Sequence, residues 1–530
     1  MKGAVRMAHV TFAGQVRRAR ERWTAALLAA GVILVLWDPA VAADAALKFL
    51  LKKGIITQSE YDEAIRDAER APGGSQPPVV PDTSTGQPAA AKPSEAQQPT
   101  AKADPAKTPD SDTTVDLGKG IKFGYDRGIY TQFKDTFRLK IRLRIQPRFT
   151  DSHFNTAYNT IGDSKNFPLV SSTGAITPLK HGESVDVFGV HRVRLVFEGF
   201  AFNPETEYFV QFRSDTNDAT TQQGGSRSTA QLYDAYLTLK QIPWANLRIG
   251  QFRTHFGRQE FQSSAFLQFV DRNFVAEAFV PNVIDRRDQG VTFFSDQTKY
   301  PINYAMGVFN GVGININRLG LNTPGNANEL MYVGRITADL LGKPGYPEGD
   351  LKNSQTPQLA VGASYGYNGG LQTNTTGAGS SNQVSTAIAS LGNGRLLNQG
   401  VVNIGTTGLD FVFKYKGLSL QAEGFVRNVD TRESAHRVGN ATGYYVQGGY
   451  FLIPTKLEVV GRYGSMDPDT QLGHDMITST VGGLNWYFNG HENKLQFDYG
   501  VITTRLGGAD VGGNVSLIEN RARLQYTIVF

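Results

Sequence analysis

The chain of 530 residues contains no cysteine, so it forms no disulfide bond and holds no thiolate-bound metal. It also lacks any central run of 18 or more apolar residues. The mature chain is therefore predicted to contain no membrane-spanning helix. The lack of cysteine fits a barrel that folds after export through an oxidising compartment.

Glycine and aromatic residues are abundant, and the chain is mildly basic. There are 58 glycines, 11% of the residues are aromatic, and the net charge is +5. This composition is compatible with a membrane β-barrel, whose signal per strand is weak. A basic chain could also bind nucleic acid. The sequence has no helix-turn-helix or RNA-binding motif, however, so no nucleic-acid partner is expected.

The first 42 residues have the pattern of a signal peptide. A basic stretch that contains Arg17 and Arg22 precedes an apolar core from Ala25 to Trp37, and residues 40–42 read Ala-Val-Ala. This order is typical of a cleaved export signal, and the apolar core is too short for a membrane anchor. Residues 1–42 are therefore predicted to be removed after export.

Two regions of different character follow. Residues 43–70 are predicted to be helical, because Gly54 suits the end of one helix and Thr57 with Glu60 forms a capping box for a second. This short periplasmic segment either associates with a partner or is a marginal hairpin without one. Residues 71–118 are rich in proline, alanine and polar residues and are predicted to form a disordered linker.

The most informative run is FRLKIRLRIQPRF at residues 137–149. Apolar residues occupy most odd positions, and five arginines or lysines occupy even ones. Period-two alternation indicates a β-strand, and lipid on one face with an aqueous lumen on the other explains both faces. A cation that faced lipid would cost about 2–4 kcal/mol near the midplane. These cations are therefore predicted to line a lumen.

From residue 119 to the C-terminus, short turns alternate with long polar stretches. Seven turns and eight longer stretches make fifteen connections, which predicts about sixteen strands in an all-β, transmembrane antiparallel β-barrel covering residues 119–530. The last strand also alternates, and Phe530 resembles the signal read by the barrel-assembly machinery. The turns are expected at 203–206, 242–244, 299–301, 342–357, 416–417, 454–456 and 489–493, and the longer stretches at 151–185, 215–230, 254–288, 311–327, 368–405, 428–441, 464–477 and 503–518.

Over roughly residues 120–530, the chain resembles the phosphate-selective porin O and P family. The resemblance implies a sixteen-stranded, usually trimeric outer-membrane channel, whose third external loop folds inward and whose anion path is lined by cations. Residues 44–65 are also similar to an N-terminal helical segment of many members. The segments that carry the resemblance are RVRLVFEGF (192–200), LYDAYLTLK (232–240), LRIGQFRTHFGRQEFQSSAFLQFVDRN (247–273), YYVQGGYFLIPTKLEVVGRY (444–463) and VGGLNWYFNGHENKLQFDYG (481–500).

Residue by residue, this resemblance is partial. Arg144 stands where the family has a lumenal arginine, and Arg192 matches the first residue of an arginine pair whose second position here is Val193. The segment Phe256–Gln289 corresponds to the constriction loop. Within it, Ala265 stands where phosphate-selective members carry a lysine. This departure weakens the case for phosphate specificity and leaves a general anion preference.

A basic wall made by the first strands is the predicted anion path. Arginine suits phosphate and carboxylate, and rings of cations favour anions. Two alternatives remain. The strand cations could pair with acids such as Glu198, Glu207, Asp234 or Asp410, and the loop charges could serve to hold the loop against the wall. The predicted pathway residues are Arg138, Lys140, Arg142, Arg144, Arg192, Arg194 and Arg213, and the predicted constriction-loop residues are Arg253, Arg258, Arg272, Arg286 and Arg287.

Motifs for catalysis or metal binding carry little weight. Residues 362–366 read Gly-Ala-Ser-Tyr-Gly, which matches a nucleophile elbow, but they lie inside an alternating strand rather than at a strand-turn-helix junction. The eight histidines show no metal-ligand spacing, and the pattern that begins at Asp215 departs from a calcium loop at Ala219. We therefore expect no catalytic residue, no cofactor and no metal.

These features predict a passive outer-membrane channel for small anions, phosphate being the leading candidate. The alternatives are a weakly selective general porin, a barrel hydrolase that uses Ser364, and a structural role in which residues 44–70 tether the barrel. The expected partners are outer-membrane lipid and lipopolysaccharide, small anions such as phosphate, two further copies of the chain in a homotrimer, and the barrel-assembly machinery.

Overall fold

The chain divides into two units, Met1–Ala106 and Lys107–Phe530. In the first unit, Gln58 alone is described, and it is helical. The predicted signal peptide, the rest of the predicted helical segment and nearly all of the predicted linker lie outside the described residues. In the second unit, the computed structural model describes residues 113–154, 184–214, 230–281, 286–297, 299–315, 329–372, 401–432, 440–471, 473, 475–506 and 515–530.

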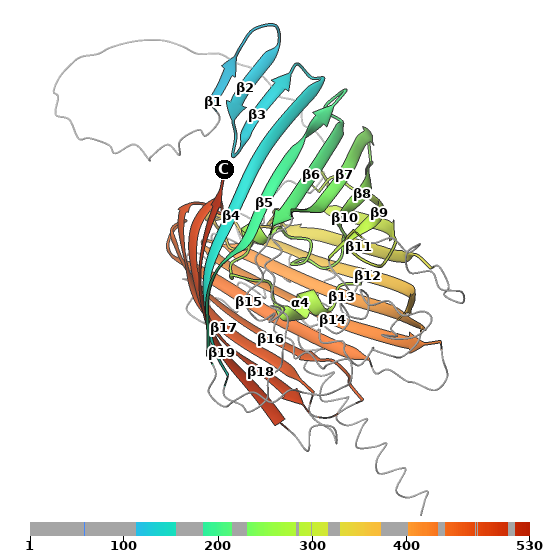
Figure 1. Ribbon diagram of the computed structural model, residues 1–530, viewed down its shortest axis with the longest axis vertical. Helices are drawn as coiled ribbons and strands as arrows, with labels where there is room; N and C mark the ends of the chain where they lie inside the picture. Colours follow the sequence, from blue (N-terminus) through green and yellow to red (C-terminus); the bar gives the residue numbers. More distant parts are fainter. Residues whose placement is uncertain are drawn as a thin grey trace, which may run out of the picture. The chain divides into compact units, whose positions relative to one another are not determined.

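Sixteen antiparallel strands form a closed barrel, as predicted, because the last strand, β19, pairs with the first barrel strand, β4 (Figure 1). The ring closes with Arg523 opposite Thr150, and the backbones of Phe530 and Leu143 exchange two hydrogen bonds. The strands are β4 (Phe137–Phe154), β5 (Ser184–Ala201), β6 (Thr206–Ser214), β7 (Gln231–Ile242), β8 (Ala245–Arg253), β9 (Arg287–Phe294), β10 (Ile302–Phe309), β11 (Met331–Leu341), β12 (Gln358–Gln372), β13 (Val401–Tyr415), β14 (Leu418–Thr431), β15 (Ala441–Ile453), β16 (Leu457–Asp467), β17 (Ile477–Asn489), β18 (Asn493–Leu506) and β19 (Val515–Val529).

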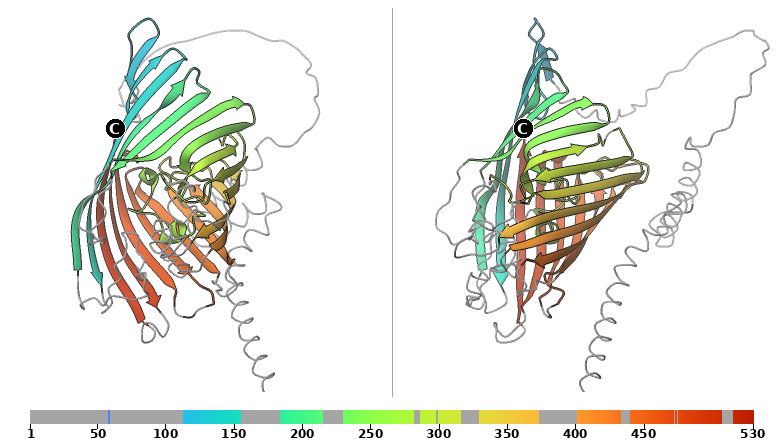
Figure 2. Two further views of the ribbon diagram at one scale, coloured as in Figure 1. Left: turned by 45° about the vertical axis from the view of Figure 1, so that its right-hand side comes forward. Right: turned by 90° about the vertical axis from the view of Figure 1, so that its right-hand side faces the viewer.

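Helix is scarce in the described part of the chain. A 3-10 turn, η1 (Ser264–Phe266), and one short α-helix, α4 (Phe274–Ala278), both lie in the connection between β8 and β9. None of the described helices is long and apolar enough to cross a membrane. Figure 2 shows from two further sides how the tilted strands curve into the barrel wall.

The strand ends agree with the predicted turns and loops. All seven predicted turns join consecutive strands at one end of the barrel, and the eight longer connections lie at the other. The turn between β13 and β14 is typical: Lys416 and Gly417 have φ angles of 45° and 82°. Such a pair of left-handed residues matches the twist of a two-residue hairpin. Outer-membrane barrels place their short turns toward the periplasm.

Three short strands that the sequence analysis did not predict extend the sheet beyond the barrel. They pair in the order β1–β2–β3–β4, and β3 lies against residues 137–141 of β4, just past the point where β19 ends (Figure 1). β1 lies in the range assigned to the linker, so regular structure begins six residues earlier than expected. The bounds are β1 (Thr113–Asp116), β2 (Ile121–Tyr125) and β3 (Ile129–Phe133).

Side chains alternate between the two faces of the wall, as the period-two pattern predicted. On β19, the side chain of Arg523 is 3% exposed inside the barrel, whereas the outward Leu524 is 45% exposed. On β7, the outward Leu237 is 51% exposed beside the buried, inward Thr238. An apolar outer face and a polar inner face are the arrangement of a barrel that stands in lipid.

Substitution Leu237→Arg tests the outward face. Because position 237 faces lipid, the arginine is expected to destabilise the barrel by about 2–4 kcal/mol. Reversible urea unfolding in phospholipid vesicles measures the change, with Leu237→Phe as the apolar control. Equal stability of the two variants would contradict the assigned orientation.

Candidate functional site

In the connection between β8 and β9, residues 254–281 fold into the barrel, where Figure 1 shows α4 inside the wall. Acids on inward positions of the far strands hold its backbone. The carboxylate of Glu423 on β14 accepts hydrogen bonds from the backbone N–H groups of Arg258 at 2.6 Å and Gln259 at 2.7 Å. Glu458 on β16 accepts a hydrogen bond from the side chain of Gln268 at 2.5 Å. We call residues 254–286 the third loop.

Glycines in the wall make room for the third loop. A Cβ atom at Gly443 on β15 would lie 2.7 Å from the Val275 side chain, and one at Gly464 on β16 would lie 2.7 Å from the Asn273 side chain. Asn273 caps α4, because its side chain accepts a hydrogen bond from the backbone N–H of Val275. The close approach of α4 to the wall therefore depends on small residues at inward positions.

The turn between β11 and β12, residues 342–357, also enters the barrel and meets the third loop. Glu348 accepts hydrogen bonds from the Gln259 side chain and the Gln268 backbone, both at 2.8 Å, and its own backbone N–H donates to Phe266. Lys414 on β13 donates to backbone oxygens of this turn. The turn and the third loop thus meet inside the barrel, whereas the sequence analysis expected the third loop alone to fold inward.

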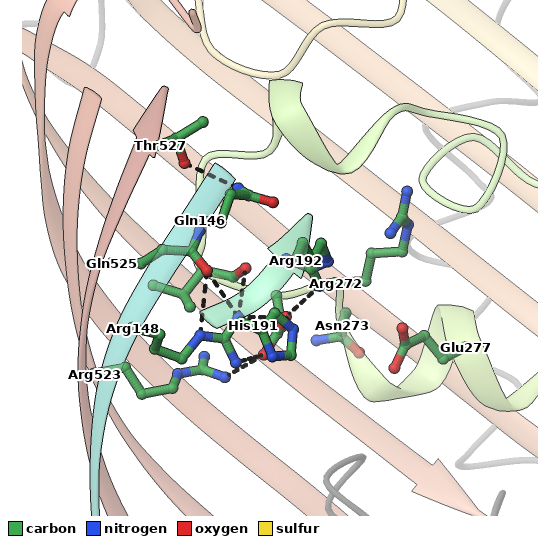
Figure 3. A network of polar contacts seen from close by, with 12 residues as sticks. Gln146, Arg148, His191, Arg192, Arg272, Asn273, Glu277, Arg523, Gln525 and Thr527 are labelled. Carbon is green, nitrogen blue, oxygen red and sulfur yellow. Dashed lines mark hydrogen bonds and ion pairs between the residues drawn. The ribbon is translucent and has the colours of Figure 1, made fainter. Parts of the chain in front are cut away.

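Asp271 ties the third loop to the opposite wall through three arginines. Its carboxylate lies 2.9 Å from Arg148 on β4, 2.7 Å from Arg192 on β5 and 2.7 Å from Arg523 on β19. The imidazole of His191 lies 3.4 Å away, and Figure 3 shows these four side chains converging. This contact corresponds to the alternative in which the loop charges hold the loop against the wall.

These contacts shift the acidity of Asp271. Burial alone would raise its pKa, but the neighbouring Arg148, His191 and Arg523 hold the pKa well below its ordinary value. Asp271 is therefore charged at neutral pH. Arg523 also forms two hydrogen bonds of 2.8 Å with Asp498 on β18, so the cluster contains three arginines and two aspartates.

Most of the arginines predicted in the constriction loop hold the loop in place. Arg253 and Arg287 are strand residues that face each other in the register of β8 and β9, so they flank the loop instead of belonging to it. Arg258 and Arg272 donate to backbone oxygens of the inserted segments. Arg286 lies 2.9 Å from Glu260, within the loop itself. The third loop thus uses its own charges for internal attachment.

The cations at the start of β4 pair with acids. Arg138 and Lys140 lie 3.6 Å and 3.0 Å from Asp126, in the turn between β2 and β3. Arg142 lies 2.6 Å from Glu198 on β5. Of the other acids named as possible partners, Asp234 pairs with Arg287, Asp410 with Arg335, and Glu207 with Lys240.

Three arginines form a row across the wall. Arg144 on β4 stands opposite Arg194 on β5, which stands opposite Arg213 on β6. The ring of Tyr233 lies 4.7 Å from the Arg194 guanidinium and 4.6 Å from that of Arg213. Arg144 is 7% exposed, and no described carboxylate lies within ion-pair distance of it. We call Arg144, Arg194 and Arg213 the arginine row.

The closed barrel, its apolar outer face and its inserted loop define a channel of the outer membrane. The family model of phosphate-selective porin O and P matches residues 180–528, about two thirds of the sequence, and the chain belongs to this family. No curated protein sequence matches the chain.

Solved structures that resemble the chain include proteins of three bacteria. A loop L8 deletion mutant of OmpT from Vibrio cholerae has a TM-score of 0.43 at 8% identity, covering 73% of this chain and 99% of its own. The channel DcaP of Acinetobacter baumannii has a TM-score of 0.44 at 13% identity, covering 74% and 97%. OccK11 (OpdR) of Pseudomonas aeruginosa has a TM-score of 0.36 at 9% identity, covering 74% and 96%.

Substitution Asp271→Asn tests the anchor of the third loop. Removing the charge weakens the hydrogen bonds from three arginines, which is expected to cost roughly 1–3 kcal/mol of loop attachment. Single-channel recordings should then show larger current fluctuations and a stronger anion preference, because positive charge is uncovered. Asp296→Asn, in the turn between β9 and β10, is the control. A current trace identical to that of the unmodified channel would contradict the anchor.

The anchor also predicts an acid-sensitive conductance. A carboxyl group whose pKa is lowered in the folded protein stabilises above its ordinary pKa, and that stabilisation is lost as the pH falls through the lowered value. The loop-dependent conductance should therefore stay constant from pH 7 to about 4 and change only at lower pH. Asp271→Asn should remove this step. A step centred near pH 6 in the unmodified channel would show that another group governs the pH dependence of the conductance.

Proposed function

We propose that the protein is a passive outer-membrane channel for small anions, with phosphate and other oxyanions as leading candidates. The observation that carries the proposal is the arginine row. The row brings three arginines of adjacent strands together at one level of the wall, and rows or rings of Arg and Lys favour anions. Arg144 adds to this argument, since a largely buried guanidinium without an ion pair in the described part of the chain needs a counter-charge.

Conduction requires binding that is strong enough to attract and weak enough to release. The predicted pathway residues offer several moderate sites: the arginine row, and the partly neutralised Arg138, Lys140 and Arg142 nearer the short turns. Arg192 shares Asp271 with two other arginines. Passage down a gradient needs no catalytic step.

A weakly selective general porin is the second candidate, and the ion pairs of β4 favour it. Asp126 and Glu198 neutralise much of the charge of Arg138, Lys140 and Arg142. If this pairing persists in the open channel, only the arginine row and the surroundings of Asp271 would distinguish anions from cations.

The hypothesis that the protein is a hydrolase has less support. Ser364 lies in the middle of β12, where its hydroxyl accepts hydrogen bonds from the Gly257 backbone N–H at 3.2 Å and from Arg335 at 2.8 Å. This hydroxyl attaches the third loop to the wall, which explains the serine without a nucleophilic role. We therefore propose a channel that is not an enzyme.

The remaining partners complete the proposal. Residues 1–42 would direct export, and Phe530 would present the last strand to the barrel-assembly machinery. The outward face would contact outer-membrane lipid and lipopolysaccharide. Three copies would assemble, with residues 43–70 available as a periplasmic tether.

Neutralising the arginine row tests the function. Loss of one unit charge about 4 Å from a permeating anion in a water-filled lumen weakens attraction by about 1 kcal/mol, or roughly fivefold. Arg144→Gln should therefore lower the anion preference by about that factor in reversal potentials measured across a chloride gradient and then a phosphate gradient. Arg138→Gln should have a smaller effect because Asp126 already offsets that charge.

The control is Lys299→Gln in an exposed turn, which should leave the reversal potential unchanged. A potential near zero in the unmodified channel would favour the general porin. An anion-selective potential that Arg144→Gln leaves intact would remove the arginine row from the pathway.

A further inference from the structure

Two aromatic rings face the lumen beside the predicted anion path, and the proposed function does not use them. Phe209 on β6 and Tyr236 on β7 stand opposite each other and stack, with ring centroids 5.1 Å apart and planes inclined by 11°. Both are partly exposed on the inner face of the wall. We call Phe209 and Tyr236 the ring pair.

Charged groups flank the ring pair on both sides. The sheet register runs Lys140, Glu198, Phe209, Tyr236 from β4 to β7, so a lysine–glutamate pair stands next to Phe209. On the other side, the guanidinium of Arg248 on β8 lies 4.2 Å from the Tyr236 ring centroid. A neighbouring strand is about 4.8 Å away, so a molecule of benzene-ring size that lies on the ring pair can reach a cation with one end.

Inorganic oxyanions gain nothing from this arrangement. They are strongly hydrated and need only cations and water, and apolar ring surface exposed to an aqueous lumen is unfavourable. The rings are not fully explained by packing. Phe209, Tyr236 and Phe252 form a series of rings in contact. The Tyr236 ring contacts the buried Phe252 ring at a centroid distance of 5.9 Å, and Phe209 is the open end of the series. An apolar ligand surface would cover this open end.

We propose that the ring pair and Arg248 bind organic carboxylates that carry an aromatic ring, and that the channel prefers them to aliphatic carboxylates of equal charge. The ligand ring would lie across the lumen-facing edges of Phe209 and Tyr236, in edge-to-face contact, while its carboxylate contacts Arg248. The three nearby acids do not oppose this, because each is paired with a cation. Asp234, two residues from Tyr236 on β7, lies 2.9 Å from Arg287. Glu198 is paired with Arg142, and Glu207, on the row next to the ring pair, is paired with Lys240 at 2.5 Å. This inference rests on the proposed anion channel and specifies its substrate class.

The test is the block of chloride current through the purified full-length channel in a planar bilayer. Benzoate and acetate carry the same charge and differ in the ring, so the ratio of their half-blocking concentrations isolates the ring. Edge-to-face contact with the ring pair predicts that benzoate blocks at a roughly fivefold lower concentration than acetate. In the double variant Phe209→Leu and Tyr236→Leu, the ratio should fall toward one.

Tyr208→Leu is the matched control, because Tyr208 lies on the same strand and faces outward. It should keep the ratio of the unmodified channel. Equal block by benzoate and acetate in an anion-selective channel would overturn this inference and leave the proposed function intact. A channel without anion selectivity would overturn both. A benzoate preference that survives in a correctly assembled double variant would show that the ring pair is not the site.

Discussion

The closure of β19 onto β4 is the constraint on which the rest of the structure depends. Because the pleat has a period of two, this register decides for every strand which side chains face lipid and which face the lumen. A slip of one residue would turn the arginines of β4 toward lipid at about 2–4 kcal/mol each near the midplane. The observed register instead brings Arg148 and Arg523 to the same inner surface, where they can share Asp271.

Asp271 lies where two sets of charges meet inside the barrel: those of the third loop and those of the wall. In the third loop, Arg286 is neutralised by Glu260 of the loop itself, Asp271 is neutralised by arginines of the wall, and wall acids such as Glu423 hold the loop backbone. The arginine row belongs to the wall itself. An inserted loop with balanced charge narrows the lumen without dictating the sign of the permeating ion, so the preference for anions would come from strands β4 to β6.

Period-two alternation made the strands and their faces predictable from sequence. The signal is strong in a membrane barrel, because each face meets a different solvent over many residues. The tight turns were predictable for a similar local reason, as at Lys416 and Gly417. The predicted lumenal direction of Arg144 follows from the same pattern.

Features that depend on distant partners were not predictable. The inward course of residues 342–357 relies on contacts of Glu348 with Phe266 and Gln268, which are about 80 positions away in the chain. The role of Asp271 relies on three strands that meet only after closure. Strands β1 to β3 are four or five residues long, too short to show a clear alternation next to a polar linker. The sequence did contain one signal for the loop contacts, namely acids at inward positions of long strands, such as Glu423 and Glu458.

The position of the two inserted segments has a consequence for selectivity. Many of their hydrogen bonds are with β13, β14, β16 and β18. The arginine row and the ring pair lie on β4–β8, where we place the proposed anion path. An ion that follows this path stays within a few ångströms of fixed positive charge, since neighbouring strands are about 4.8 Å apart. Cations there are partly neutralised by Asp126 and Glu198, which lowers the depth of each site and favours release. Selectivity and throughput would thus be set by the same wall: Arg144, which pairs with no carboxylate in the described part of the chain, attracts the anion, and the paired charges nearer the short turns let it leave.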